Sequence, residues 1–206
     1  MTTTGGWFES FLKVLAFKDL GTHFHALRVG GYCQVVAKKL GRSEVNPEHI
    51  FFAAQLHDIG KVGVPDHILF KFGKLTYEEF HIVKVHSRLG YEILKESGLK
   101  AEPYYDMALE IALSHHEQCN GQGYPKGLTG SEIPLAAKIA ALADSFDAMV
   151  CDRPYKRAMA PEMAFKILKT GLASGKFDRD VHSAFDGSAD EIMAVFKEHK
   201  GADSAL

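Results

Sequence analysis

The sequence predicts an all-α fold. Apolar residues recur at intervals of three and four along most of the chain, which is the spacing of one face of an α-helix. No segment alternates apolar and polar residues for long enough to predict a β-strand. The chain has 206 residues, of which 46% are hydrophobic, so it can bury one sizeable core. We therefore expect one helical domain with short additional pieces at its ends.

The first expected helix has an apolar face in the sequence GWFESFLKVLAF. We expect this face to pack into the core, with a dimer contact as the alternative. Further helices follow wherever the same spacing recurs, separated by glycine, proline and polar residues. The face of the first helix consists of Trp7, Phe8, Phe11, Leu12 and Leu15. The expected helices span residues 7–18, 23–40, 47–57, 77–97, 103–117, 134–150, 161–172 and 189–199.

Local signals indicate where several of these helices begin and end. Asn46 followed by Pro47 is typical of an N-cap with proline at the first helical position. Thr76 with Glu79 three residues later fits a capping box. Glycines often follow a helix because they adopt the left-handed conformation without strain. Three glycines stand where helices are expected to end: Gly41, Gly98 and Gly171.

Composition and charge limit the classes of partner. The formal net charge of −2 gives no overall attraction to DNA or to an anionic membrane. The three cysteines are far apart and form no C-x-x-C pair, which suits a reducing compartment and argues against a thiolate metal site. No apolar run approaches the roughly 18 residues that span a bilayer. We therefore expect a cytoplasmic protein that binds neither DNA nor a membrane.

Histidines carry most of the candidate chemistry, and their positions decide which of them matter. His57 shares a helical face with Ile50 and Ala53, and Asp58 follows it directly. His115 and His116 lie at the end of another expected helix, in register with the apolar positions before them. These rings are therefore expected to point toward the core.

Asp144 is unusual because it shares a face with alanines in the expected helix over 134–150. An unpaired buried carboxylate costs several kcal/mol, so a positive group should face it. That group is either an arginine or lysine side chain or a divalent metal ion. Imidazole and carboxylate ligands together suit Fe, Mn, Zn or Ni, whereas a structural zinc site would favour cysteine.

Other histidines are expected to have no role in such a site. His23 and His25 are two residues apart, so on a helix their rings point about 200° apart and only one can enter a shared site. The remaining five lie on polar faces or in loops, and we expect them to be solvated. They are His49, His67, His81, His182 and His199.

Five motifs follow one another along the chain: HALRV (25–29), HDIGKVGVPDHIL (57–69), LTYEEFHIVKVHSRLGYEIL (75–94), HHEQCNGQGYPKGLTGSEIP (115–134) and ADSFDAMVCDRPYKRA (143–158). In this order they resemble the HD-GYP subgroup of the HD-domain metal-dependent phosphohydrolases, and the resemblance runs from about His25 to about Phe185. It implies an HD-domain helical bundle with a central di-metal site and additional C-terminal helices. It also divides the chain into an N-terminal helical extension (1–22), the catalytic domain (23–186) and a C-terminal helix with a frayed tail (187–206).

The resemblance implies a phosphodiesterase that hydrolyses the bacterial second messenger cyclic di-GMP to pGpG, with GMP as a candidate further product. The reaction would use a hydroxide that bridges two divalent transition-metal ions, Fe or Mn before Zn or Ni. Asp58 is placed to bridge the ions, and Lys61 matches the lysine that family members direct at the scissile phosphate. The metal ligands carried over are His25, His57, Asp58, His86, His115, His116 and Asp144, and the substrate contacts are Gly123, Tyr124, Pro125, Arg153 and Lys156.

Two departures from the family pattern affect the expected site. Family members with a third metal commonly carry glutamate four residues before the first ligand histidine, and here that position is Gly21. We therefore expect two metals. Asn120 stands in the loop that carries the family signature Gly123-Tyr124-Pro125, here called the signature loop, at a position where family members often have aspartate. Asparagine keeps the turn chemistry and removes a charge.

Two alternatives to the enzyme remain at this point. One is a binding module with weak catalysis that senses cyclic di-GMP or docks to a diguanylate cyclase (GGDEF) or another regulatory protein. The other is a hydrolase of another cyclic dinucleotide or of a nucleotide. A homodimer is a candidate assembly. A module that needs only its surface would not require buried histidine and aspartate, so the motifs favour the enzyme.

Overall fold

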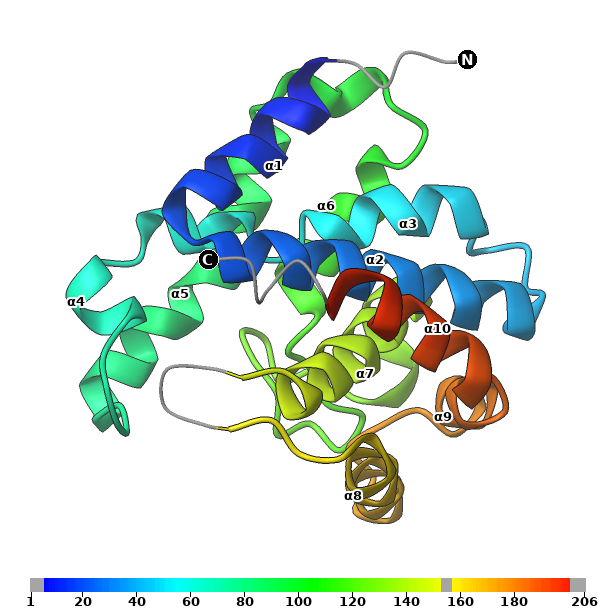
Figure 1. Ribbon diagram of the computed structural model, residues 1–206. Helices are drawn as coiled ribbons and strands as arrows, with labels where there is room; N and C mark the ends of the chain where they lie inside the picture. Colours follow the sequence, from blue (N-terminus) through cyan, green and yellow to red (C-terminus); the bar gives the residue numbers. More distant parts are fainter. Residues whose placement is uncertain (1–5, 153–156, 201–206) are drawn as a thin grey trace.

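The computed structural model describes residues 6–152 and 157–200. These parts of the chain contain helices and no strand, apart from one isolated bridge between Asn120 and Thr129. The predicted all-α class is confirmed (Figure 1). The α-helices are α1 (Gly6–Lys18), α2 (Leu20–Leu40), α3 (Pro47–Gln55), α4 (Asp66–Leu69), α5 (Tyr77–Lys95), α6 (Tyr105–Ser114), α7 (Leu135–Val150), α8 (Pro161–Ala173), α9 (Arg179–Asp186) and α10 (Ala189–Lys200), with 3-10 turns at Ile59–Gly63, Gly98–Ala101 and Gly130–Glu132.

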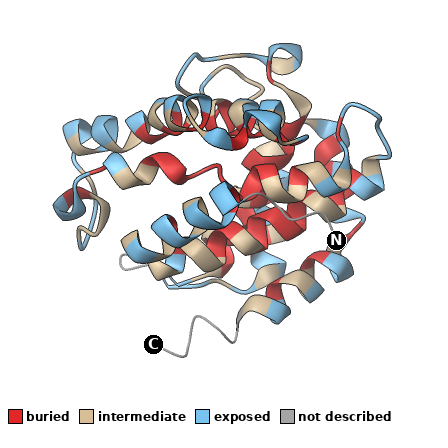
Figure 2. Cartoon of the chain, turned by 90° about the horizontal axis from the view of Figure 1, so that it is seen from above, coloured by how far each residue is buried: buried red, intermediate tan, exposed pale blue. Residues whose placement is uncertain are grey.

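Helix α2 is the centre of the bundle. It runs across the middle of Figure 1 and packs against α1, α3, α7 and α10. Helix α6 fills the space between α3, α5 and α7. Buried residues lie along the inner faces of these helices, as the red segments of Figure 2 show. Their burial removes apolar surface from water and holds fixed the helix ends that carry the candidate ligands.

The predicted helix starts are confirmed by their caps. The Asn46 side chain accepts the backbone N–H groups of Glu48 at 2.8 Å and His49 at 3.2 Å, and Pro47 opens α3. Thr76 and Glu79 form the capping box of α5. Gly41 ends α2 with a φ of 62°, in the left-handed region that glycine tolerates.

The predictions for the other two glycines were wrong. Helix α5 ends at Lys95, before Gly98, and α8 continues through Gly171 to Ala173. Gly171 instead makes room for a ring, since a Cβ there would lie 2.6 Å from Cε2 of Phe177. Close packing, and not a helix end, explains this glycine.

Two short helices have no counterpart in the predicted set. Helix α4 has four residues, too few to produce a recognisable apolar period. Helix α9 begins after Asp178, whose side chain accepts the N–H groups of Asp180 at 3.0 Å and Val181 at 3.2 Å. Its burial corrects one prediction: His182 is only 6% exposed and was wrongly expected to be solvated. His67 and His81 are exposed as expected, and His49 and His199 are half-buried.

Helix α1 packs into the core, as predicted. Phe8 and Leu15 are buried, and Phe11 and Leu12 pack against the core. Trp7 differs, because it is 59% exposed. Among the helices that the structure describes, none has both the length and the apolar character that crossing a membrane requires.

Candidate metal centre

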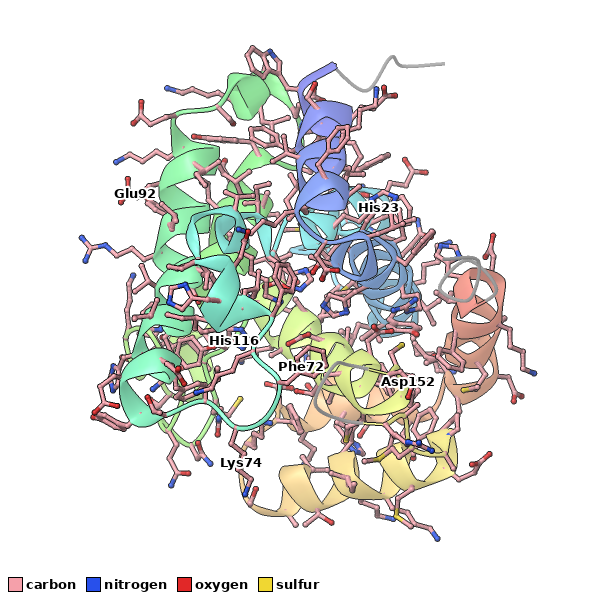
Figure 3. All side chains as sticks on the ribbon, turned by 60° about the vertical axis from the view of Figure 1, so that its left-hand side comes forward. His23, Phe72, Lys74, Glu92, His116 and Asp152 are labelled. Carbon is pink, nitrogen blue, oxygen red and sulfur yellow. The ribbon has the colours of Figure 1, made fainter. Side chains whose placement is uncertain are left out.

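The structure brings together all of the side chains predicted as metal ligands. They come from the interior of α2, the turn after α3, the middle of α5, the end of α6 and the middle of α7. Figure 3 places His116 in the interior of the bundle, whereas Glu92 lies on its outer side. Two groups of ligand atoms each lie within 4.8 Å of one another: Asp58, His86, His115 and His116 in one, and His25, His57 and Asp58 in the other.

Asp58 belongs to both groups, and its two oxygens face different histidines. Oδ2 lies 3.7 Å from Nε2 of His25 and 3.2 Å from Nε2 of His57. Oδ1 lies 3.4 Å from Nε2 of His86 and 3.9 Å from Nε2 of His115. This arrangement gives one carboxylate oxygen to each of two neighbouring positions, as a carboxylate that bridges two cations requires.

Asp144 lies on the His25 side of the centre. Its Oδ1 is 3.2 Å from Nε2 of His25. It was expected to face either a basic side chain or a metal ion, and in the structure it faces the imidazole cluster. The arginine that could have paired with it, Arg28, contacts Asp147 instead.

The orientation of three rings is fixed by backbone carbonyls. Nδ1 of His57 lies 2.7 Å from the carbonyl oxygen of Ala54, and Nδ1 of His86 lies 2.7 Å from that of Val83. Nδ1 of His115 lies 2.9 Å from the carbonyl oxygen of Ile111. Because a carbonyl oxygen only accepts hydrogen bonds, each Nδ1 must carry the proton. In the neutral rings Nε2 is therefore the unprotonated, ligating nitrogen.

The Nε2 atoms of the cluster converge, and those of His86 and His115, whose Nδ1 atoms donate to carbonyl oxygens, face each other lone pair to lone pair. Nε2 of His86 lies 3.4 Å from that of His115 and 3.2 Å from that of His116, and Nε2 of His25 lies 3.1 Å from that of His57. Acceptors at this separation repel one another unless a cation lies between them. Asp58 Oδ1 also lacks a compensating partner, since it is buried and forms no hydrogen bond.

The electrostatic environment indicates which cation is suited to the centre. Burial lowers the pKa of His86, lowers that of His115 well below its usual value, and lowers that of His116 to about 3. Burial alone would raise the pKa of Asp58, but Lys61 and His57 hold it well below its usual value. Protons therefore do not resolve the convergence of His86, His115 and His116, whereas divalent metal ions would, and the donor set of imidazole and carboxylate suits Fe, Mn, Zn or Ni. His25 differs: burial alone would lower its pKa, but its hydrogen bonds with Asp144 and Asp147 raise it.

One buried network beside the centre was missed by the sequence analysis. Asp147 Oδ2 lies 2.8 Å from Nδ1 of His25, while Arg28 Nε donates to Asp147 Oδ1 at 2.8 Å and the Tyr32 hydroxyl donates to the same oxygen at 3.0 Å. Asp147 therefore turns the Nε2 of His25 toward the cluster, as Ala54 does for His57. The spacing signal was available, because Asp147 follows Asp144 by three residues and Arg28 follows His25 by three.

Lys61 lies beside the centre, where the sequence placed it. Its ammonium group forms an ion pair with Asp58 Oδ2, and its side chain is 18% exposed. The 3-10 turn that follows Asp58 brings the two residues together, three positions apart. Lys61 can therefore reach both the ligand carboxylate and a bound anion in front of it.

The signature loop covers the His116 side of the centre. The Tyr124 ring stacks on the His116 ring with centroids 4.6 Å apart, and the Lys84 ammonium lies 5.1 Å from the Tyr124 centroid. Gly123 packs on the preceding backbone, where a Cβ would lie 2.4 Å from Cα of Glu117. Pro125 is exposed.

Glu117 holds this loop in place and was not singled out from the sequence. Its buried carboxylate accepts the backbone N–H of Lys126 at 2.7 Å and that of Leu128 at 2.9 Å. Asn120 ties the same loop to the segment after α8, because its Nδ2 donates to the carbonyl oxygen of Ser174 at 3.3 Å. An aspartate there would lack this donor, so the departure from the family pattern has a structural role.

Two residues near the first ligand histidine lie outside the centre, and two predicted substrate contacts fall outside the described part of the chain. Gly21 is exposed in the first turn of α2, where its N–H donates to the N-cap Asp19 at 3.1 Å, so it supplies no ligand. His23 is not in either ligand group and its Nδ1 is buried without a partner. Arg153 and Lys156 lie outside the described residues, which stop at Asp152 (Figure 3) and resume at 157.

Comparison with known proteins identifies relatives of the chain. A family profile described as HD domain matches residues 12–181. The chain is 45% identical over 189 residues to a cyclic di-GMP phosphodiesterase of Thermotoga maritima, covering 92% of the chain and 50% of that protein. It is 42% identical over 156 residues to the cyclic di-GMP phosphodiesterase response regulator RpfG of Xanthomonas campestris, covering 76% of the chain and 40% of that protein.

The fold is also found among solved structures. The HD domain of the phosphodiesterase PgpH of L. monocytogenes, in complex with cyclic-di-AMP, aligns with a TM-score of 0.63 and 23% identity. The alignment covers 92% of this chain and 96% of that one. The chain spans about half the length, or less, of the curated relatives it matches.

Proposed function

The chain belongs to the HD domain family, and we propose that it is a metal-dependent phosphodiesterase that hydrolyses cyclic di-GMP to pGpG, with GMP as a candidate further product. The HD-GYP resemblance of its motifs agrees with relatives that are named cyclic di-GMP phosphodiesterases. One observation carries the proposal: Asp58 directs one oxygen toward Nε2 of His57 and the other toward Nε2 of His86, in two separate groups of candidate ligands.

Two divalent transition-metal ions are proposed for this centre, with Fe or Mn preferred over Zn or Ni. Asp58 would bridge them. The other proposed ligands are His25, His57, His86, His115, His116 and Asp144. No glutamate stands at Gly21 to extend the set, which supports two ions in place of three.

The ions, when bound, would activate a water molecule for attack on phosphorus and polarise the phosphoryl oxygens. Lys61 directs a positive charge at the phosphate and balances the negative charge that grows on it during attack. The same ammonium group is the proposed proton donor to the departing 3′ oxygen. Asp147 and the carbonyl oxygens of Ala54, Val83 and Ile111 hold the rings in the orientation that ligation needs.

The substrate contacts proposed from the resemblance are the loop residues Gly123, Tyr124 and Pro125 and the basic residues Arg153 and Lys156. The position of Tyr124 on the His116 ring supports a place at the edge of the site. Gly123 acts through packing, because it allows the loop to lie against Glu117. A diguanylate cyclase (GGDEF), another regulatory protein or a second copy of the chain are candidate partners, and the proposed location is the cytoplasm.

The experiment is product analysis with metal-loaded protein. Wild type, Asp58→Ala and the control Asp190→Ala are incubated with cyclic di-GMP, and products are separated by chromatography and identified by mass. Asp190 is exposed on α10, away from the centre. Asp190→Ala therefore removes one carboxylate, as Asp58→Ala does, without changing the candidate metal ligands. Wild type and the control should form pGpG, and Asp58→Ala should be inactive.

Two outcomes would contradict the proposal. Equal turnover by wild type and Asp58→Ala would show that the two-metal chemistry is wrong. Binding of cyclic di-GMP by fully metal-loaded wild type without any product would identify the chain as a binding module.

A further inference from the structure

A cavity of about 490 Å³ lies between α7 and α8 and shares Asp144 with the metal centre. Asp144 forms part of its wall, so one proposed metal ligand borders both spaces. Its volume falls in the range of roughly 300 to 1,000 Å³ that is typical of small-molecule sites. The rest of the wall is mainly apolar and includes Ala148, Met149, Leu168 and Phe177.

Lys176 is the basic residue of this cavity. Its ammonium group lies 4.8 Å from the centroid of the Phe177 ring, which is itself buried. Its backbone is held at both ends: its N–H donates to the carbonyl oxygen of Gly171 at 2.9 Å, and its carbonyl oxygen accepts the N–H of Cys119 at 3.0 Å. The residue is therefore fixed between α8 and the signature loop.

The shape and chemistry of the cavity fit a purine base. Flat aromatic rings are stabilised by apolar walls such as those of Met149, Leu168 and Phe177. A lysine supplies three hydrogen-bond donors and no acceptor. Guanine presents two adjacent acceptors, O6 and N7, which lysine can bind together, whereas adenine presents a donor beside N7.

We propose that this cavity receives one purine base of the dinucleotide and that Lys176 determines a preference for guanine over adenine. The inference rests on the proposed function, because a phosphodiester held at the centre beside Asp144 would place its attached nucleoside at the cavity mouth. Asp144 then has two neighbours of different function, the metal ligands on one side and the base cavity on the other.

An alternative role for Lys176 is electrostatic support of Asp144. Asp144 is close enough to raise the pKa of Lys176, although burial lowers it more. Such a role would alter metal affinity and slow the hydrolysis of every diester alike. Base recognition would alter the discrimination between guanine and adenine substrates and leave metal content unchanged.

The test compares wild type, Lys176→Met, Lys176→Arg and the control Lys169→Met, which changes an exposed lysine on α8. Measurements are metal content and kcat/KM for cyclic di-GMP, cyclic di-AMP and bis(p-nitrophenyl) phosphate, a diester without a purine. Lys176→Met should lose about tenfold or more in kcat/KM for cyclic di-GMP and in its preference over cyclic di-AMP, since a bidentate base contact carries discrimination of that order. Its loss on bis(p-nitrophenyl) phosphate should be much smaller. Lys176→Arg should retain the preference.

Several results would overturn the inference. An unchanged preference in Lys176→Met would do so, as would an equal loss on all three diesters or a fall in metal content. If wild type hydrolyses bis(p-nitrophenyl) phosphate and no cyclic dinucleotide, the proposed function fails by itself. Base binding in the cavity is then tested by equilibrium binding of GMP and AMP to wild type and Lys176→Met. Equal selectivity for GMP over AMP in both proteins would reject the role of Lys176.

Discussion

Asp144 and Asp147 lie one helical turn apart on α7, yet their surroundings differ. Asp147 is 1% exposed and is satisfied by protein groups: the Arg28 guanidinium, the Tyr32 hydroxyl and the His25 ring. The Asp144 side chain is 18% exposed, and its Oδ1 faces Nε2 of His25 at 3.2 Å. Both carboxyls have a pKa below the usual value, although burial alone would raise it.

The difference distinguishes a buried carboxylate that stabilises the fold, Asp147, from one that is available to bind a cation, Asp144. A buried carboxylate with complete hydrogen bonds contributes to the folded state, and removal of its partner is costly. A carboxylate in a cluster of imidazole ligands gains its full set of charged partners only when a metal ion binds. Asp58 is the second member of this incomplete class, because its Oδ1 is buried without a partner.

The largest expected effect separates the two carboxylates directly. Asp144→Asn should lower kcat by more than about 100-fold, since even residues that only orient metal ligands cost about 10- to 100-fold. In metal-free protein it should lose less stability than Asp147→Asn. Urea unfolding with chelator, together with kinetics of the metal-loaded variants, measures both. Greater destabilisation by Asp144→Asn than by Asp147→Asn would reverse the comparison.

The next effect tests the satisfied network without metal. Arg28→Met should destabilise the metal-free protein by about 3 to 5 kcal/mol, because it leaves a buried carboxylate without its counter-charge. The double variant Arg28→Met with Asp147→Asn should recover part of this loss, as expected for residues in direct contact. Chemical denaturation of the four proteins gives the coupling. Strictly additive losses would mean that Arg28 does not stabilise Asp147.

Acid titration sharpens the same contrast. Burial alone would raise the pKa of Asp147, but the hydrogen bond with His25 and the charge of Arg28 lower it to about 2 from its usual 3.8. Because the pKa of Asp147 is lowered on folding, the ionised carboxylate stabilises the folded state at pH values above its usual pKa of 3.8. This stabilisation is lost as the pH falls toward about 2. The contribution is about 2 kcal/mol. The stability gap between wild type and Asp147→Asn should therefore narrow as pH falls from about 5 to 2.5, whereas an Asp190→Asn control should show a constant gap.

The smallest expected effect concerns the loop beside the centre. Glu117→Gln replaces one acceptor with an amide donor, so one of the N–H groups of Lys126 and Leu128 loses its partner. We expect about 1 kcal/mol of lost stability. Hydrogen exchange should quicken at these two amides, and Glu92→Gln, an exposed change on α5, serves as control. Unchanged exchange at Lys126 and Leu128 would show that the carboxylate does not hold the loop.

Much of the fold and site followed from local sequence signals. The caps at Asn46 and Thr76 and the apolar period gave the long helices, and the ordered motifs identified the proposed ligands. Asp147 and the proposed role of Lys176 were missed for a physical reason. Both depend on residues far away in the sequence, Arg28 for Asp147 and the α7 side of the cavity for Lys176. His182 was misjudged because α9 is too short to reveal its buried face by period alone.

The most direct test of the central claim is the metal content of wild-type protein, measured by elemental analysis before and after exhaustive treatment with chelator and paired with cyclic di-GMP hydrolysis. The converging nitrogens and the bridging Asp58 predict about two divalent transition-metal ions per chain. Hydrolysis should disappear with the ions and return when they are restored. Full hydrolysis by protein from which the ions have been removed would contradict the account.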